Sequence, residues 1–178
     1  MKTRDMALIA AFAAVITVCA WISVPAAVPF TLQTFAVFLA VGLLGGKRGT
    51  IAVAVYILLG AVGVPVFSGF NGGLGALLGI TGGYILGFLA AAAVMWGLTS
   101  VLGGSVPALA FSMAAGMLTC YALGTAWFMV VYARTQGAVT LLAVLSKCVF
   151  PFILPDLVKI GLALLLTVRL KRLVPAAA

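Results

Sequence analysis

An acid and a base lie close together in an apolar stretch near the end of the chain. Asp156 and Lys159 are three positions apart, and the only other acidic residue of the 178 is Asp5, near the N-terminus. Ionisable side chains inside membrane segments are costly and usually mark the path or site of a substrate or ion. Alternatively, the pair only neutralises itself on one helix face at a membrane edge, and the spacing leaves both explanations open.

The residues around this pair predict a helix that positions it. An apolar pattern runs from 155 to 170, and Pro155 suits a first helical position because the missing N–H is no loss there. Asp156 would then lie in the first turn, where the positive end of the helix favours an acid. In a cavity, the pair would offer a ligand both a hydrogen-bond acceptor and a donor.

The composition identifies the chain as an integral membrane protein. Hydrophobic residues make up 66% of it and charged residues 7%, whereas the apolar share of a soluble domain is about half. The length suits a single all-α domain, residues 1–178, with six transmembrane helices of roughly 17 to 25 residues in one bundle. The first apolar run is interpreted as a retained helix rather than a cleaved signal peptide.

Several functional classes lack the residues that they need. Without histidine, without a second acid beside Asp156 and without a metal-ligand cluster, an enzyme would have few acid–base candidates. No phosphate-binding G-x-x-x-x-G-K-[ST] motif is present, so ATP binding by this chain is not expected. Cys19, Cys120 and Cys148 lie in separate apolar segments and are interpreted as small buried hydrophobes. We therefore expect no catalytic residue, metal or cofactor in this chain.

The predicted helices are separated by turns rich in glycine, proline or charge. Their ranges are 5–24, 31–44, 50–62, 84–101, 108–132 and 155–170, with turns at 45–49 and 103–107. The apolar segment 138–149 is too short to span and is expected to be interfacial or re-entrant. Between the third and fourth helices, the segment 63–83 is rich in glycine yet hardly polar. Irregular backbone of this kind is tolerated only under protein or around a wet cavity, so we expect an outer loop that folds over the bundle.

Two further features have more than one explanation. The first helix carries small residues at Ala7, Ala10, Ala11 and Ala14, a spacing that permits close packing by another helix but also fits a generic alanine-rich helix. Gln33 lies near the start of the second helix. It could contact a ligand or bond to backbone groups that Pro29 leaves free.

The charge distribution predicts an orientation. Lys2, Arg4, Lys47, Arg48, Arg169, Lys171 and Arg172 would all lie on one side of a six-span bundle. By the positive-inside rule that side, with both termini, is cytoplasmic. The candidate ligand groups then gather on the outer side, as a small-molecule site would require.

Five ordered motifs give the chain a family resemblance. They are Val28-Pro-Phe-Thr-Leu-Gln-Thr-Phe35, Leu44-Gly-Gly-Lys-Arg-Gly49, Gly63-Val-Pro-Val-Phe-Ser-Gly69 running on to Gly72-Gly73, Thr81-Gly-Gly-Tyr-Ile-Leu-Gly-Phe88, and Phe150 to Lys159. With them, nearly the whole chain resembles BioY, the biotin-binding S component of energy-coupling factor (ECF) transporters. Two positions depart from the family pattern: Ile80 stands where a proline is common, and Pro155 directly precedes Asp156, where a glycine often intervenes.

The resemblance implies a function, partners and site residues. Biotin would be captured outside the cytoplasmic membrane of a prokaryote and delivered inward with a transmembrane coupling (T) subunit and two cytoplasmic ATPase subunits, which hydrolyse ATP. Asp156 and Lys159 would contact the bicyclic head or the carboxylate of biotin. The loop would cover the ligand through Ser68, Asn71, Gly72 and Gly73, and the coupling subunit would dock at Ala7 and Ala11.

The chemistry of biotin fits these residues. Its ureido group has a carbonyl acceptor and two N–H donors, which suit a carboxylate beside an ammonium. Phe67 and Tyr84 would pack against its thioether ring and tail. The main alternative is a stand-alone carrier or facilitator of another small organic acid or vitamin. That function would require a continuous polar path, for which the first and fifth helices offer almost no residues.

Overall fold

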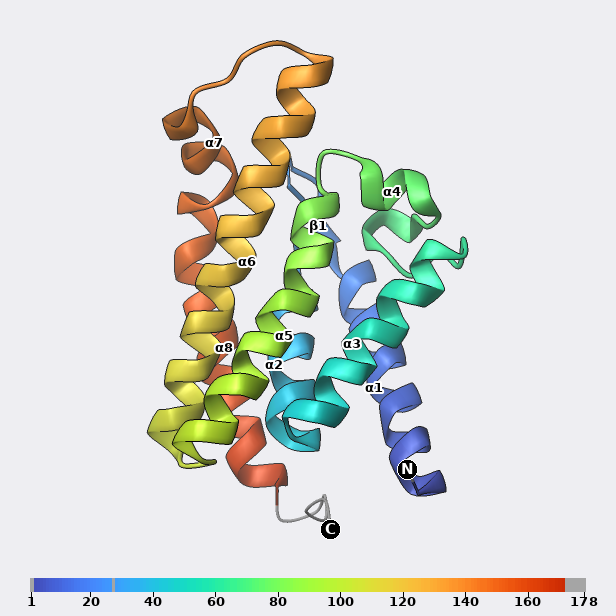
Figure 1. Cartoon of the computed structure of the whole chain (residues 1–178), viewed down its shortest axis with the longest axis vertical. Helices are drawn as coiled ribbons and strands as arrows, with labels where there is room; N and C mark the ends of the chain where they lie inside the picture. Colours follow the sequence, from blue (N-terminus) through green and yellow to red (C-terminus); the bar gives the residue numbers. More distant parts are fainter. Residues whose placement is uncertain (1, 27, 172–178) are drawn as a thin grey trace.

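The structure is a computed structural model that describes residues 2–26 and 28–171. Within these residues the chain is almost entirely α-helical, and its helices pack side by side in one bundle (Figure 1). Four helices are long and apolar enough to cross a membrane: α1 (Thr3–Trp21), α5 (Gly82–Leu102), α6 (Val106–Thr135) and α8 (Phe150–Leu170). The prediction of an all-α membrane protein is confirmed. Six spans remain a prediction, since four of the described helices meet the requirements of length and composition.

Two shorter helices complete the bundle, α2 (Gln33–Leu44) and α3 (Gly46–Ala61). At a rise of about 1.5 Å per residue, the 12 residues of α2 extend about 18 Å, less than the hydrocarbon core of about 30 Å. Nearly all of α2 is buried, and it packs against α8, α3 and α1. It is therefore a core element that other helices surround.

The turn between α2 and α3 is shorter than the sequence predicts. Gly45 alone joins them, with a φ of +82° that favours glycine. α3 begins at Gly46, four residues before the predicted start at position 50, so the expected turn at 45–49 is wrong. A side chain at Gly49 would overlap the backbone of Val41, which shows how closely the two helices approach.

The last helix also begins earlier than predicted. α8 starts at Phe150 with Pro151 in its first turn, and Pro155 lies inside the helix. The prediction that Pro155 opens the helix is therefore wrong, and Asp156 lies in the second turn. The helix continues through Pro155 although the missing N–H removes one hydrogen bond, the one to the carbonyl four residues earlier, and the proline ring crowds that carbonyl.

The glycine-rich segment is partly helical, unlike the prediction of a wholly irregular loop. Residues 63–81 contain a 3₁₀ turn, η1 (Ser68–Phe70), and a short helix, α4 (Leu74–Leu78). Gly63, Gly69 and Gly73 have positive φ angles and divide the segment into these short pieces. We call residues 63–81 the lid segment, because part of it lines the cavity described below.

A short hairpin and a short helix lie at the same end of the bundle as the lid segment. Strands β1 (Ser23–Val24) and β2 (Phe30–Thr31) form an antiparallel hairpin that the sequence did not predict. Helix α7 (Leu141–Cys148) falls within the predicted short segment 138–149. Figure 1 shows the hairpin, α4 and α7 toward the upper end and the N-terminus and the end of α8 at the lower one.

The lower end carries most of the positive charge of the described residues. Lys2, Arg4, Lys47, Arg48, Arg169 and Lys171 belong to elements that end there, while Arg172 lies outside the described residues. Asp5 pairs with Arg48 at 2.6 Å, and the Arg48 side chain also donates from Nε to the Leu44 carbonyl at 3.0 Å. Arg48 thus connects the starts of α1 and α3 to the end of α2.

Candidate ligand-binding site

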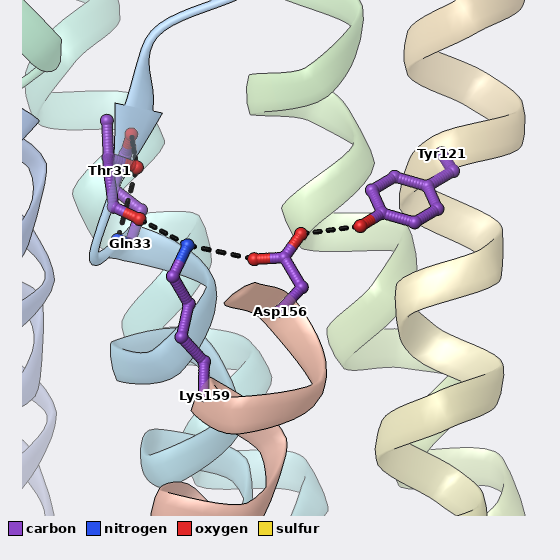
Figure 2. Close-up of polar contacts among 5 residues, drawn as sticks. All are labelled: Thr31, Gln33, Tyr121, Asp156 and Lys159. Atoms are coloured by element: carbon purple, nitrogen blue, oxygen red, sulfur yellow. Dashed lines mark hydrogen bonds and ion pairs between the residues drawn. The ribbon is translucent and has the colours of Figure 1, made fainter. Parts of the chain in front are cut away.

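Asp156 and Lys159 form a buried ion pair on α8. Lys159 Nζ donates to Asp156 Oδ1 at 2.8 Å, and the two residues are only 4% and 3% exposed (Figure 2). The same ammonium donates to the Thr31 carbonyl of β2 at 2.6 Å and lies 4.1 Å from the centre of the Phe30 ring. Lys159 therefore ties α8 to the hairpin. The two charges also neutralise each other, so both explanations of the pair stay open.

Tyr121 joins this cluster from α6. Its hydroxyl donates to Asp156 Oδ2 at 2.6 Å, so the two oxygens of one carboxylate each accept a hydrogen bond from a different helix (Figure 2). The sequence analysis missed Tyr121. The available signal was a tyrosine inside an apolar span, because a buried hydroxyl needs a hydrogen-bond partner.

Gln33 belongs to a second polar group beside the first. Its side-chain amide donates to the Tyr56 hydroxyl at 2.6 Å and accepts from Thr31 Oγ1 at 3.0 Å. These bonds go to side chains rather than to backbone groups left free by Pro29. Contact of Gln33 with a ligand stays a prediction. Thr31 links the two groups, because its carbonyl accepts from Lys159.

A cavity of about 470 Å³ opens beside these groups. Its volume lies within the range of small-molecule sites. Six of the predicted site residues line it: Gln33, Ser68, Asn71, Gly72, Tyr84 and Lys159. Thr31 and Tyr121, which the sequence analysis did not select, line it too. The structure thus brings the starts of α2 and α5, the first half of α8, the middle of α6 and the lid segment to one site.

Two predicted site residues do not line the cavity. Asp156 lies behind Lys159 and Tyr121, and both of these reach the cavity. Gly73 has a φ of +86° and donates its N–H to the Gly60 carbonyl at 2.7 Å, so it shapes the lid segment from outside the cavity. Direct ligand contact by these two residues remains a prediction. Their geometry indicates that they position their neighbours.

Apolar side chains form most of the remaining wall. Phe67 and Tyr84, which were predicted for this role, line the cavity together with Phe88, Met117 and Phe152. Cys120 and Cys148 are buried, as expected of small hydrophobes, and also contribute to the wall. Among the described residues, no group of three His, Cys, Asp or Glu could hold a metal ion.

The predicted docking residues lie on another part of the molecule. Ala7 and Ala11 are exposed on α1, as are Ala10 and Ala14, while the opposite face of the helix is buried. They occupy the half of α1 that begins at the lower end of the bundle, away from the cavity. The structure therefore leaves this small-residue face uncovered.

An apolar bundle that encloses a cavity with a buried ion pair defines a membrane-embedded protein that binds a small molecule. The structure is similar to a solved structure described as the S-component for biotin from an ECF-type ABC transporter. The TM-score is 0.83 at 26% identity, covering 97% of this chain and 95% of that one. The fold is that of an S-component.

The sequence comparison identifies the family. The model of the BioY family matches residues 1–176, and the chain belongs to this family. The biotin transporter BioY of Thermotoga maritima is 44% identical over 163 residues, covering 91% of this chain and 92% of that protein. The probable biotin transporter BioY of Pyrococcus horikoshii is 41% identical over 175 residues, covering 96% and 98%. The predicted family is confirmed.

Proposed function

We propose that this protein takes up biotin, binding it in the cavity on the outer side of the membrane and delivering it inward. The observation that carries this proposal is the cavity lined by Lys159 and Tyr121 and backed by Asp156. The relatives support the choice of ligand, because they are described as transporters of biotin. A transport function also agrees with a site that offers hydrogen bonds and apolar contacts without catalytic groups.

The charges of the site favour the ureido head of biotin over its carboxylate as the group beside Lys159. The ammonium is already neutralised by Asp156, so a second buried anion would add an uncompensated negative charge. An ammonium has three N–H donors, and two are used by Asp156 and Thr31. The third can donate to the ureido carbonyl, which carries no net charge.

The rest of the cavity suits the remaining parts of the ligand. Phe67, Tyr84 and Phe88 provide apolar surface for the thioether ring and the methylene tail. Ser68 and Asn71 place polar groups of the lid segment at the wall. Gly72 is required for the path of the lid segment, since a side chain there would overlap the Val64 carbonyl.

We also propose the orientation and the partners. Six helices, α1, α2, α3, α5, α6 and α8, form the membrane bundle in the cytoplasmic membrane of a prokaryote, and the positive lower end with both termini faces the cytoplasm. The sequence lacks a nucleotide-binding motif. Two ATPase subunits would therefore supply the energy. A transmembrane coupling subunit would dock at Ala7 and Ala11, on the exposed small-residue face of α1.

Titration calorimetry of the purified protein tests the ligand. Biotin should bind, while lipoate and thiamine should not. Biotinamide, which lacks the carboxylate charge, should keep most of the affinity if the ureido head lies beside Lys159. Tight binding of lipoate without binding of biotin would instead favour a carrier of another organic acid.

Uptake of labelled biotin by cells with and without the coupling subunit and ATPases tests the energy source. Transport that needs all of these subunits supports the proposal. Equal uptake without them would identify a stand-alone carrier.

A further inference from the structure

We propose that Trp21 is a positioning residue that holds the lid segment closed over the cavity, an inference that rests on the proposed role of this cavity as the biotin site. Trp21 is the last residue of α1 and does not line the cavity. Its indole N–H donates to the Pro65 carbonyl at 2.9 Å. Its ring also packs on Phe70, with the ring centres 5.0 Å apart. One side chain of α1 thus contacts the lid segment at two points.

The backbone of Phe70 explains why the second contact matters. Phe70 has a φ of +58°, and among the described residues it is the one non-glycine residue with a positive φ. That conformation is unfavourable for a bulky residue and persists only where the surroundings enforce it. Phe70 as a whole residue is 64% exposed, and its ring packs on the ring of Trp21. Trp21 therefore stabilises a strained turn.

This turn carries two of the polar side chains that the lid segment presents to the cavity. Ser68 and Asn71 flank it, and both line the cavity. They also bond to each other, because the Asn71 amide donates to the Ser68 carbonyl at 2.9 Å. A contact on the outside of the lid segment thereby fixes two groups on its inside.

The other attachments of the lid segment lie elsewhere and would survive the loss of Trp21. Phe67 packs into the space left by Gly60, and the Gly73 N–H donates to the Gly60 carbonyl. Helix α3 therefore holds the lid segment at these two residues. At the far end, Trp127 Nε1 of α6 donates to the Gly79 carbonyl at 2.9 Å. Removing the Trp21 contacts should therefore loosen the turn at 68–71 without unfolding the protein.

Binding kinetics test this role. Trp21→Phe keeps an aromatic ring beside Phe70 but removes the hydrogen bond to Pro65, and biotin should dissociate about fivefold faster with little change in association rate. Phe70→Ala removes the ring contact from the other side and should have a similar effect. Trp96→Phe is the matched control, because Trp96 lines a separate cavity at the lower end of the bundle. Unchanged dissociation rates in both lid variants would overturn the proposal.

A measurement without ligand separates this proposal from the assignment of biotin. In the protein without biotin, Trp21→Phe should speed hydrogen exchange at the Phe67 amide, which donates to Asn71, and leave α5 unchanged. If the unsubstituted protein fails to bind biotin, the proposed function is wrong, but this comparison still decides the role of Trp21. Equal exchange at residues 66–71 in both proteins would show that Trp21 does not hold the lid segment.

Discussion

Replacing Asp156 by Asn, alone and together with Lys159→Met, separates the structural role of the ion pair from its role in binding. The single replacement leaves the Lys159 ammonium, 4% exposed, with two neutral acceptors, the Thr31 carbonyl and the new amide oxygen at position 156, and with no negative charge beside it. Removing one partner of a buried pair costs about 3 to 5 kcal/mol, because the other charge remains uncompensated. The double replacement removes both charges and should recover most of that stability.

Biotin binding should respond differently from stability. Loss of one charged hydrogen bond to the ligand should reduce the binding free energy by about 1.5 to 3 kcal/mol, which corresponds to a dissociation constant roughly 10- to 150-fold larger. The double variant should therefore be stable yet bind poorly, because Lys159 Nζ is the charged donor at the cavity wall. Asp156→Asn alone should weaken both properties.

Reversible unfolding in detergent measures the stability, and titration calorimetry measures the dissociation constant. Both variants remove the charged acceptor of the Tyr121 hydroxyl. The effect of losing that acceptor is therefore common to both, and any difference between the two variants reports on Lys159. If the double variant binds biotin with the dissociation constant of the unsubstituted protein, the pair is purely structural and the argument for a ligand site at Lys159 fails.

Three other predictions follow from the contacts described above. Tyr121→Phe leaves one oxygen of Asp156 without its hydrogen bond, so biotin affinity should fall about five- to tenfold in calorimetry. Hydrogen exchange across residues 68–83 should slow when biotin is added, because a bound ligand stabilises the closed lid segment. Ala7→Trp and Ala11→Trp should leave biotin binding intact but sharply reduce uptake in cells with the coupling subunit and ATPases, because a bulky side chain blocks close helix packing.

Each of these predictions has a control and an outcome that contradicts it. Tyr132→Phe, near the end of α6 and outside the cavity lining, should leave affinity unchanged; a similar loss in both tyrosine variants would argue against a specific role for Tyr121. Equal exchange with and without biotin would count against a lid. Ala93→Trp, at an exposed alanine of α5, should preserve uptake. Normal uptake by the two α1 variants would place the docking surface elsewhere.

The sequence predicted the elements whose signals are local and strong. Long apolar runs predicted the four long helices, and an isolated acid near a lysine predicted the ion pair. Six of the eight residues predicted to bind the substrate line the cavity. Glycine density drew attention to the segment between α3 and α5, but the two short helical turns inside it depend on backbone geometry that composition does not encode.

The rest depended on contacts between residues distant in the sequence. Pro155 resembles a helix start as strongly as Pro151 does, and the packing of α8 decided between them. Tyr121 meets Asp156 from another helix, 35 positions away, and no spacing within either helix predicts that contact. The roles of Asp156 and Gly73 behind the cavity wall also depend on side-chain direction, which motif matching does not supply.

Helix α1 connects the end of the molecule near Ala7 to the end at which Trp21 contacts the lid segment. Its 19 residues extend about 28 Å, so a tilt of about 10° at the end that carries Ala7 would move Trp21 by about 5 Å. The Trp21 end of α1 is also tied to the hairpin, because the Leu32 N–H donates to the carbonyl of Cys19 and to that of Ile22, which directly follows α1. Leu32 in turn follows Thr31, whose carbonyl accepts from Lys159.

A displacement of that size exceeds the length of a hydrogen bond. Tilting α1 would therefore break the bond from Trp21 to the Pro65 carbonyl and, at the same time, move the Thr31 carbonyl away from Lys159. A membrane partner that tilts α1 on docking would then weaken ligand binding without contacting the ligand. By thermodynamic reciprocity, bound ligand would oppose that docking by the same factor. If α1 tilted in this way, the affinity of the site would depend on the angle of a helix that contributes no residue to the cavity lining.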